Sequence, residues 1–254
     1  MSPVELQVTT HFSFLRGASS AQELFATAAL MGMRALAVTD RNSLAGIVRA
    51  HEAAKETGVR LIVGCRLDLR CGMSVLVYPI DRAGYGGLCR LLSLGKARAG
   101  KGACHLDWAD LADHADGLMA VLVPDMADDD CALRLRRMRD VFGERASLAL
   151  TLRRRPNDAL RLHQLSALAA RAGVATVVTN DVLYHHPDRR ILQDVVTAIR
   201  LNTTVDALGL RRERHADRHL KPPAEMARLF ARHPDALARS AEIADRCRFT
   251  LDDL

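Results

Sequence analysis

Aspartate and arginine side chains come directly after several predicted β-strands. Asp40 and Arg41 follow a predicted strand at 35–39, Arg66 follows one at 60–64, and Asp181 follows one at 174–179. Because the carboxyl ends of parallel strands meet at one edge, these side chains are expected to lie close together. Two carboxylates there could hold a divalent metal or act as an acid and base pair. Guanidinium groups would repel a cation, so ion pairs of Arg41 and Arg66 with Asp40 and Asp181 are favoured over a metal site.

Basic residues in the second half of the chain are a second group that could do chemistry. The net charge is +6, and residues 151–254 carry 18 basic and 13 acidic side chains against 18 and 17 in residues 1–150. Arg153, Arg154, Arg155, Arg211 and Arg212 form two short basic runs that could contact DNA phosphates. A solvated basic edge is the competing interpretation of these runs.

The elements that must position these residues alternate along the chain between short aliphatic strands and helices. Strands are predicted at 6–10, 35–39, 60–64, 74–79, 117–124, 147–152 and 174–179. A helix begins after the Ser20 and Glu23 capping box, and two others end at Gly58 and Gly173. This order predicts an α/β fold with a mainly parallel sheet, closed or nearly closed into a barrel.

The pattern changes after the last predicted strand. Helices are predicted at 187–200, 223–232 and 234–246 with no strand between them. We therefore expect a barrel domain at 1–186 and a helical extension at 187–254.

Composition excludes several classes of protein. The 254 residues are 49% hydrophobic and 26% charged, which is typical of a globular protein and excludes disordered and fibrous chains. No run approaches the ~18 apolar residues of a membrane span, and the amino terminus lacks the features of a secretory signal, so a cytoplasmic location without membrane contact is expected. The six cysteines form no Cys-x-x-Cys pair, which argues against a zinc ribbon.

Several stretches of the chain carry a resemblance to a known family. Residues 7–17, 37–42, 61–66 and 179–184 resemble the amino-terminal polymerase and histidinol phosphatase (PHP) domain of bacterial C-family DNA polymerases, and the error-prone branch most of all. Residues 81–93, 192–200 and 218–226 support the resemblance, which covers essentially the whole chain. It implies a distorted seven-stranded barrel whose mouth, in metal-binding members, holds a cluster of His, Asp and Glu ligands.

The resemblance also implies that this metal site is degenerate. The first strand carries Gln7 and Thr9 in place of His-x-His, and the next positions are Arg41 in place of His and Arg66 in place of Glu. Pro124 stands at a ligand position after the strand at 117–124, and Leu183 replaces the His of the Asp-x-His motif that follows the last strand. Of the usual ligands, Asp40 and Asp181 remain. Two carboxylates cannot build a multinuclear site, so we expect no catalytic residue and no metal in this chain. We expect the positive charges of Arg41 and Arg66 to replace the charge of the lost metal and to hold the barrel mouth together by ion pairs.

The function implied is that of the amino-terminal PHP module of an error-prone DNA polymerase, acting in damage-induced, mutagenic translesion synthesis. The magnesium-binding palm of this family lies carboxy-terminal to the PHP domain, and this chain ends at Leu254. We therefore expect an excised domain or a truncated product with a structural role and no polymerase activity alone. Its expected partners are the remainder of the polymerase, DNA within that polymerase, and other mutagenesis or replication proteins.

Two other functions stay open on the sequence. One is a metal-dependent phosphoesterase or 3′-5′ exonuclease of the PHP type, against which the ligand losses argue. The other is a free-standing DNA-binding protein that uses the basic carboxy-terminal part.

Overall fold

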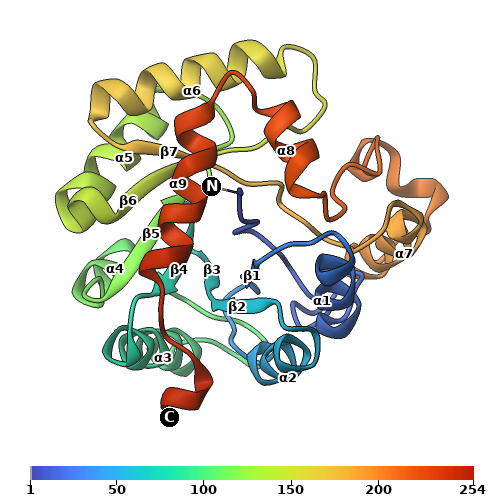
Figure 1. Cartoon of the computed structure of the whole chain (residues 1–254), viewed down its shortest axis with the longest axis horizontal. Coiled ribbons are helices and arrows are strands. Elements are labelled where there is room, and N and C mark those ends of the chain that lie inside the picture. Colours follow the sequence, from blue (N-terminus) through green and yellow to red (C-terminus); the bar gives the residue numbers. More distant parts are fainter. Residues whose placement is uncertain (1) are drawn as a thin grey trace.

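The computed structural model describes residues 2–254 as a mixed α/β fold in which helices surround a central group of strands (Figure 1). The strands are β1 (Ala35–Val38), β2 (Arg60–Val63), β3 (Cys65–Asp68), β4 (Ser74–Pro79), β5 (Leu118–Leu122), β6 (Ala146–Leu150) and β7 (Ala175–Val178). The helices are α1 (Ala21–Leu30), α2 (Ile47–Thr57), α3 (Arg82–Ala97), α4 (Trp108–Asp113), α5 (Asp129–Phe142), α6 (Asp158–Ala172), α7 (Arg190–Arg200), α8 (Pro223–Leu229) and α9 (Pro234–Arg246). Short 3₁₀ helices lie at Gly143–Arg145, Pro187–Arg189, Asp206–Arg211 and Leu251–Asp253.

The strands form two sheets. β1 and β2 pair in parallel, and the second sheet has the order β3-β4-β5-β6-β7. β4 runs antiparallel to both β3 and β5, whereas β5, β6 and β7 are parallel. The predicted α/β class is therefore confirmed, but the prediction of a mainly parallel sheet is wrong at β3 and β4.

The sequence does not predict the separate strand β3, because Gly64 is expected to end the strand at 60–64. Gly64 lies between β2 and β3, where an added Cβ would lie 2.8 Å from the Tyr78 ring and 2.9 Å from Thr39 Cγ2. Only glycine allows that close approach. Residues 65–68 then pair with β4, which places Arg66 and Asp68 in the sheet.

The predicted strand at 6–10 forms only isolated bridges, Glu5 with Leu36 and Val8 with Val182. Backbone hydrogen bonds still connect this segment to β1 and to residue 182, including Thr39 N to Val8 O at 2.8 Å and Thr9 N to Val182 O at 2.9 Å. The Glu5 carboxylate, however, accepts hydrogen bonds from the backbone N–H groups of Gln7 and Asn180. These side-chain bonds replace the ladder bonds that a regular strand would make.

Local signals placed the helix ends well. Ser20 Oγ accepts from Glu23 N at 3.2 Å while the Glu23 carboxylate accepts from Ser20 N at 2.9 Å, so the predicted capping box is present. Gly58 and Gly173 end α2 and α6 with φ of 73° and 63°, a conformation that glycine adopts without strain. The three predicted carboxy-terminal helices are found as α7, α8 and α9.

Helix α9 closes one end of the strand group, as Figure 1 shows, where it crosses in front of the strands beside the amino terminus. Its Ile243 and Ala244 are fully buried in one cluster with Leu6, Ile62 and Leu76. Arg60 secures the end of the helix by donating to the carbonyl oxygens of residues 244 and 247. Burial of this apolar face provides the main driving force for packing α9 against the strands.

Within residues 2–254, none of the helices combines the length and the apolar sequence that crossing a lipid bilayer requires.

Candidate functional site: an arginine-filled mouth

The predicted cluster forms at the carboxyl ends of the strands, around a cavity of about 380 Å³. We call this cavity the mouth. Charged side chains line it in both signs: Arg41, Arg66, Arg134, Arg153 and Arg218, with Asp125, Asp128, Asp130 and Asp181. Five guanidinium groups against four carboxylates leave no net negative charge in the mouth that would attract a metal cation.

Asp181 is the centre of the ion-pair network in the mouth. It follows β7, has a φ of 48°, and is 5% exposed. Arg218 Nη2 lies 2.5 Å from one carboxylate oxygen, Arg66 Nη1 lies 3.4 Å from the other, and Gln7 Nε2 donates to that second oxygen at 2.8 Å. Burial alone would raise the pKa of this carboxyl, but the Arg218 and Arg66 charges hold the pKa well below its usual value.

Arg41 and Arg66 share a second carboxylate, that of Asp68. Arg41 forms an ion pair with Asp68, and Arg66 Nε lies 3.3 Å from the other Asp68 oxygen and donates to Ser74 Oγ at 2.7 Å. Burial would raise the pKa of Asp68, yet the two arginines lower it. The predicted Arg66–Asp181 pair is thus confirmed, whereas the predicted pairing of Arg41 with Asp40 is wrong because β3 places Asp68 within reach.

Asp40 lies below the mouth and is 1% exposed. Its two oxygens accept hydrogen bonds from Thr10 N at 2.8 Å, Thr10 Oγ1 at 2.8 Å and Ser13 Oγ at 2.7 Å. Burial raises the pKa of this carboxyl in spite of these bonds. Both Asp40 oxygens thus already accept hydrogen bonds from hydroxyl or amide donors.

The remaining degenerate positions do not all lie at the mouth. Pro124 lines the mouth. Gln7 is buried beneath it, where it accepts from Thr179 Oγ1 at 2.8 Å, and Thr9 is also buried. Leu183 lies outside the mouth in a small apolar cluster with Ala18 and Tyr184.

The side chains present do not fit a metal. Within residues 2–254, no three His, Cys, Asp or Glu side chains gather into a group that could hold an ion. The two retained carboxylates are occupied, Asp40 by hydroxyl and amide donors and Asp181 by guanidinium groups. No catalytic step through a metal follows from this geometry.

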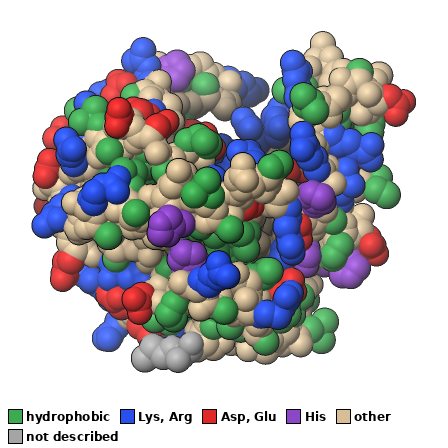
Figure 2. Space-filling view, turned by 90° about the horizontal axis from the view of Figure 1, so that it is seen from above, with side chains coloured by type: hydrophobic (Ala, Val, Ile, Leu, Met, Phe, Trp, Pro, Cys, Tyr) green, Lys and Arg blue, Asp and Glu red, His purple; other side chains and the backbone are tan. Residues whose placement is uncertain are grey.

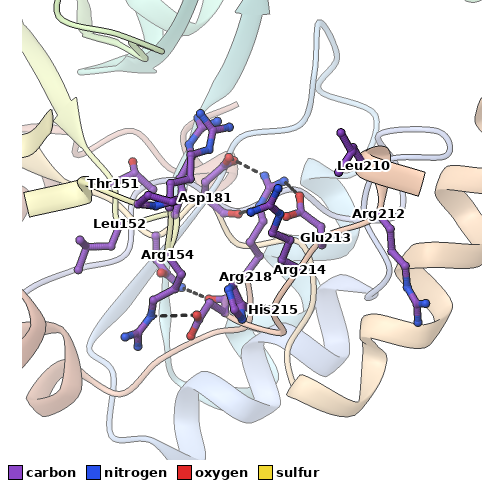
Figure 3. A pocket seen from close by; sticks show the side chains of 15 residues that line it. Thr151, Leu152, Arg154, Asp181, Leu210, Arg212, Glu213, Arg214, His215 and Arg218 are labelled. Carbon is purple, nitrogen blue, oxygen red and sulfur yellow. Dashed lines mark hydrogen bonds and ion pairs between the residues drawn. The ribbon is translucent and has the colours of Figure 1, made fainter. Parts of the chain in front are cut away.

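A second cavity, of about 500 Å³, adjoins the mouth and shares Arg153, Asp181 and Arg218 with it. We call it the side pocket (Figure 3). Arg153, Arg154, Arg155 and Arg212 line it, so the structure brings four of the five predicted DNA-contact residues together from two distant segments. Arg211 is exposed and does not line it. Figure 2 shows a hollow at the upper edge of that view with Lys and Arg side chains gathered around it.

Carboxylates neutralise two of the arginines that line the side pocket. Arg154 Nε lies 2.9 Å from Asp217 and Arg212 Nε lies 2.8 Å from Asp194. Arg155 forms no ion pair with any residue in the described part of the chain, and neither does Arg211. Arg153 is mostly buried, which lowers its pKa, and its Nε atom has no hydrogen-bond partner within residues 2–254.

Sequence reasoning missed two important residues. Arg218 lies 37 positions from Asp181, so no spacing in the sequence predicts that the two side chains meet. They meet because the segment before α8 folds back onto residue 183, where Leu183 N donates to Arg218 O at 2.9 Å. Glu5 is buried beside Asn180 and Lys221, and burial raises its pKa to about 7. An acidic residue inside an otherwise apolar strand-like segment was the only sequence signal for Glu5.

Comparison with known proteins places this geometry in a family. The PHP domain family matches residues 5–155. Error-prone DNA polymerase 1 of Agrobacterium fabrum is 66% identical over 98% of this chain, error-prone DNA polymerase 2 of Rhizobium meliloti 63% over all of it, and the error-prone DNA polymerase of Caulobacter vibrioides 48% over 98%. The chain spans 23% of the length of each of these relatives.

Solved structures with a similar fold are distant in sequence. A protein described as a metal-dependent phosphoesterase from Bifidobacterium adolescentis superimposes with a TM-score of 0.53 at 13% identity, covering 70% of this chain and 86% of its own. An amidohydrolase from Chromobacterium violaceum gives 0.51 at 17% identity, covering 71% and 87%. These similarities concern the fold alone.

Proposed function

The chain belongs to the PHP domain family, and from this premise we propose that it serves as the PHP region of an error-prone DNA polymerase. Its similarity to such polymerases extends over 98–100% of its residues at 48–66% identity. We propose that the region has a structural role in damage-induced, mutagenic DNA synthesis and that its own metal site is degenerate.

The observation that carries the structural role is Asp181, held between Arg66 and Arg218. A hydrolytic metal site needs a carboxylate that is free to bind the ion and a water activated by it. Here two guanidinium groups and the Gln7 amide surround that carboxylate. The arginines neutralise the buried negative charge where a cation does so in metal-binding members.

We propose further that the strands form a closed, distorted barrel. The segment at 5–9 hydrogen-bonds to β1 on one side and to residue 182, just after β7, on the other. Residues 40–42 hydrogen-bond to Arg66 in β3, with Arg66 N to Asp40 O at 3.0 Å and Asn42 N to Arg66 O at 2.8 Å. These contacts connect both edges of the five-stranded sheet to β1 and support closure. The division into a barrel at 1–186 and an extension at 187–254 is part of the same proposal.

We also propose that DNA contacts this region through Arg153, Arg154, Arg155 and Arg212, which line the side pocket, and through Arg211, which is exposed next to Arg212 in the chain. Arg155 and Arg211 are exposed and carry no ion pair within residues 2–254, so their charges are available to phosphates. Arg155→Ala with Arg211→Ala should reduce the magnitude of the slope of log affinity against log salt by about 1.4 for single-stranded DNA, since each phosphate contact contributes about 0.7. Arg49→Ala with Arg171→Ala, on α2 and α6 and outside both cavities, is the matched control.

The structural role is tested by metal content and hydrolysis. The purified chain is incubated with zinc, manganese and magnesium, and metal is measured together with hydrolysis of a phosphomonoester and of 3′-ended DNA. We expect no stoichiometric metal and no hydrolysis. Bound metal with turnover that is lost in Asp40→Asn would overturn the proposal in favour of a metal-dependent phosphoesterase.

The polymerase context is tested by a chimaera. This chain replaces the matched region of error-prone DNA polymerase 1 of Agrobacterium fabrum, to which it is 66% identical. We expect the chimaera to extend a primed template at a rate within about tenfold of the parent, because contacts between the PHP region and the rest of the polymerase should be largely retained. A folded chimaera without primer extension would argue against this assignment.

A further inference from the structure

Helix α7 has its polar side chains inside and its apolar side chains outside, the reverse of an ordinary surface helix. Gln193, Asp194 and Thr197 on one face are buried, with exposed fractions of 3%, 3% and 8%. Ile191 and Ile199 on the other face are 73% and 59% exposed. Leu192 and Val195 are exposed beside them, so the aliphatic residues recur at i, i+1, i+4 and i+8 along one stripe.

The buried contacts fix the rotation of α7. Gln193 Nε2 donates to Arg16 O at 2.9 Å, and Asp194 accepts from Arg212 Nε at 2.8 Å. Arg200 Nη1 at the end of the helix donates to Leu15 O at 2.8 Å. Turning the apolar stripe inward would break all three contacts and would leave Asp194 without its partner, which is costly for a buried charge. The stripe therefore faces outward as a fixed surface.

No described element covers this stripe. α7 lies on the right of Figure 1, and Ile191, Leu192, Val195 and Ile199 are 73%, 39%, 38% and 59% exposed. Four aliphatic side chains on three turns of one helix form a contiguous apolar patch, which in folded proteins marks an interaction surface. Single exposed residues elsewhere, such as Leu30 on α1, form no comparable stripe.

We infer that the outer face of α7 is the surface on which the remaining part of an error-prone DNA polymerase packs, an inference that rests on the proposed function. The relatives extend well beyond the matched region, since this chain spans only 23% of their length. The fitting surface on that part is apolar, with a carboxylate facing Arg200, because Arg200 has no acidic partner within residues 2–254. An aliphatic stripe bounded by one unpaired cation gives such an interface both affinity and orientation.

Hydrogen exchange tests the surface directly. Amide exchange along α7 is compared between this chain alone and the Agrobacterium chimaera defined above. Covering the stripe should slow exchange of the α7 amides by about tenfold or more in the chimaera, since opening of the helix would then require undocking. Ile191→Glu with Ile199→Glu should abolish that slowing in the chimaera.

A matched pair of substitutions controls for added charge. Leu30→Glu with Leu160→Glu changes two residues on α1 and α6 that are 89% and 54% exposed. This pair should leave the exchange of α7 unchanged. Because all four side chains point to solvent, neither pair should prevent folding, and circular dichroism of the chain alone verifies this for both.

The outcomes separate this inference from the proposed function. A chimaera that extends primers while α7 exchanges as fast as in the chain alone overturns the docking surface and leaves the proposed function intact. A chimaera that slows α7 exchange without extending primers supports the surface and overturns the function. The chain alone could instead form concentration-dependent dimers that are lost in Ile191→Glu with Ile199→Glu, which would assign the surface to a second copy. It could also bind phosphatidylcholine vesicles and lose that binding in the same variant, which would assign the surface to a lipid membrane. Either result overturns the inference.

Discussion

Arg218 holds Asp181 at both its side chain and its backbone. Arg218 Nη2 lies 2.5 Å from Asp181 Oδ2, and Arg218 Nε donates to the Asp181 carbonyl oxygen at 3.0 Å. The same guanidinium lies 2.9 Å from Glu213, and its pKa is raised, since the effect of burial is outweighed by the charges of Asp181 and Glu213. One side chain thus joins the end of β7 to the segment before α8.

Replacement of this arginine should therefore destabilise the protein. Arg218→Met removes the closest positive charge from a buried carboxylate, and we expect a loss of about 3 kcal/mol in the free energy of unfolding, measured by urea denaturation. Arg155→Met, at an exposed arginine without an ion pair in the described residues, should change it by less than about 0.5 kcal/mol. Adding Asp181→Asn to Arg218→Met should recover part of the loss; an unchanged or larger loss would show that the ion pair is not its cause.

Arginine substitutions at the mouth should not by themselves restore a metal site. Arg41→His with Arg66→Glu supplies two ligand types, but Gln7 and Thr9 still stand at two ligand positions, and Gln7 and Arg218 still contact the Asp181 carboxylate. We expect no zinc or manganese uptake in this double variant by calorimetry and elemental analysis, because too few ligands surround the ion. Adding Gln7→His and Thr9→His provides the comparison variant. Stoichiometric uptake by the double variant would contradict our interpretation of the two arginines.

The buried carboxyl of Glu5 predicts a specific dependence of stability on pH. Burial raises its folded pKa from 4.5 to about 7, so between these values the folded state binds more protons than the unfolded state. The contribution of Glu5 is therefore fully present below about pH 4.5 and is lost as the pH rises through about 7, by about 3 kcal/mol in total. Glu5→Gln should remove this fall, as followed by urea denaturation at pH 5 and pH 8. Parallel pH profiles for the two proteins would refute the assignment to Glu5.

Two glycines on α3 should respond in opposite directions to alanine. A Cβ at Gly84 would lie 2.2 Å from Gly117 O, a rigid backbone atom, whereas a Cβ at Gly86 would meet only the flexible end of Arg90 at 3.4 Å. Gly84→Ala should lower the free energy of unfolding by about 1–3 kcal/mol, and Gly86→Ala should raise it by up to about 1 kcal/mol. Thermal unfolding of both variants checks this, and equal shifts would show that packing at Gly84 is not the cause.

Local sequence patterns are enough to predict the helices, the α/β class and the group of charged residues at the strand ends. Those features follow from local rules: the Ser20 capping box, the glycines that end α2 and α6, and the convergence of parallel strand ends, which brought Arg66 and Asp181 together. Resemblance also pointed to the family that the comparisons support.

The partners of those charges and the orientation of α7 depend instead on contacts between distant segments of the chain. The distance along the chain between Arg218 and Asp181 gives no local pattern. Asp68 reaches Arg41 because β3 continues past Gly64 and pairs with β4, and Gly64 is needed there because Tyr78 approaches it closely. The periodicity of α7 predicts an amphipathic helix, but periodicity cannot say which face is buried. Only the contacts of Gln193 and Asp194 with distant segments turn its apolar side outward.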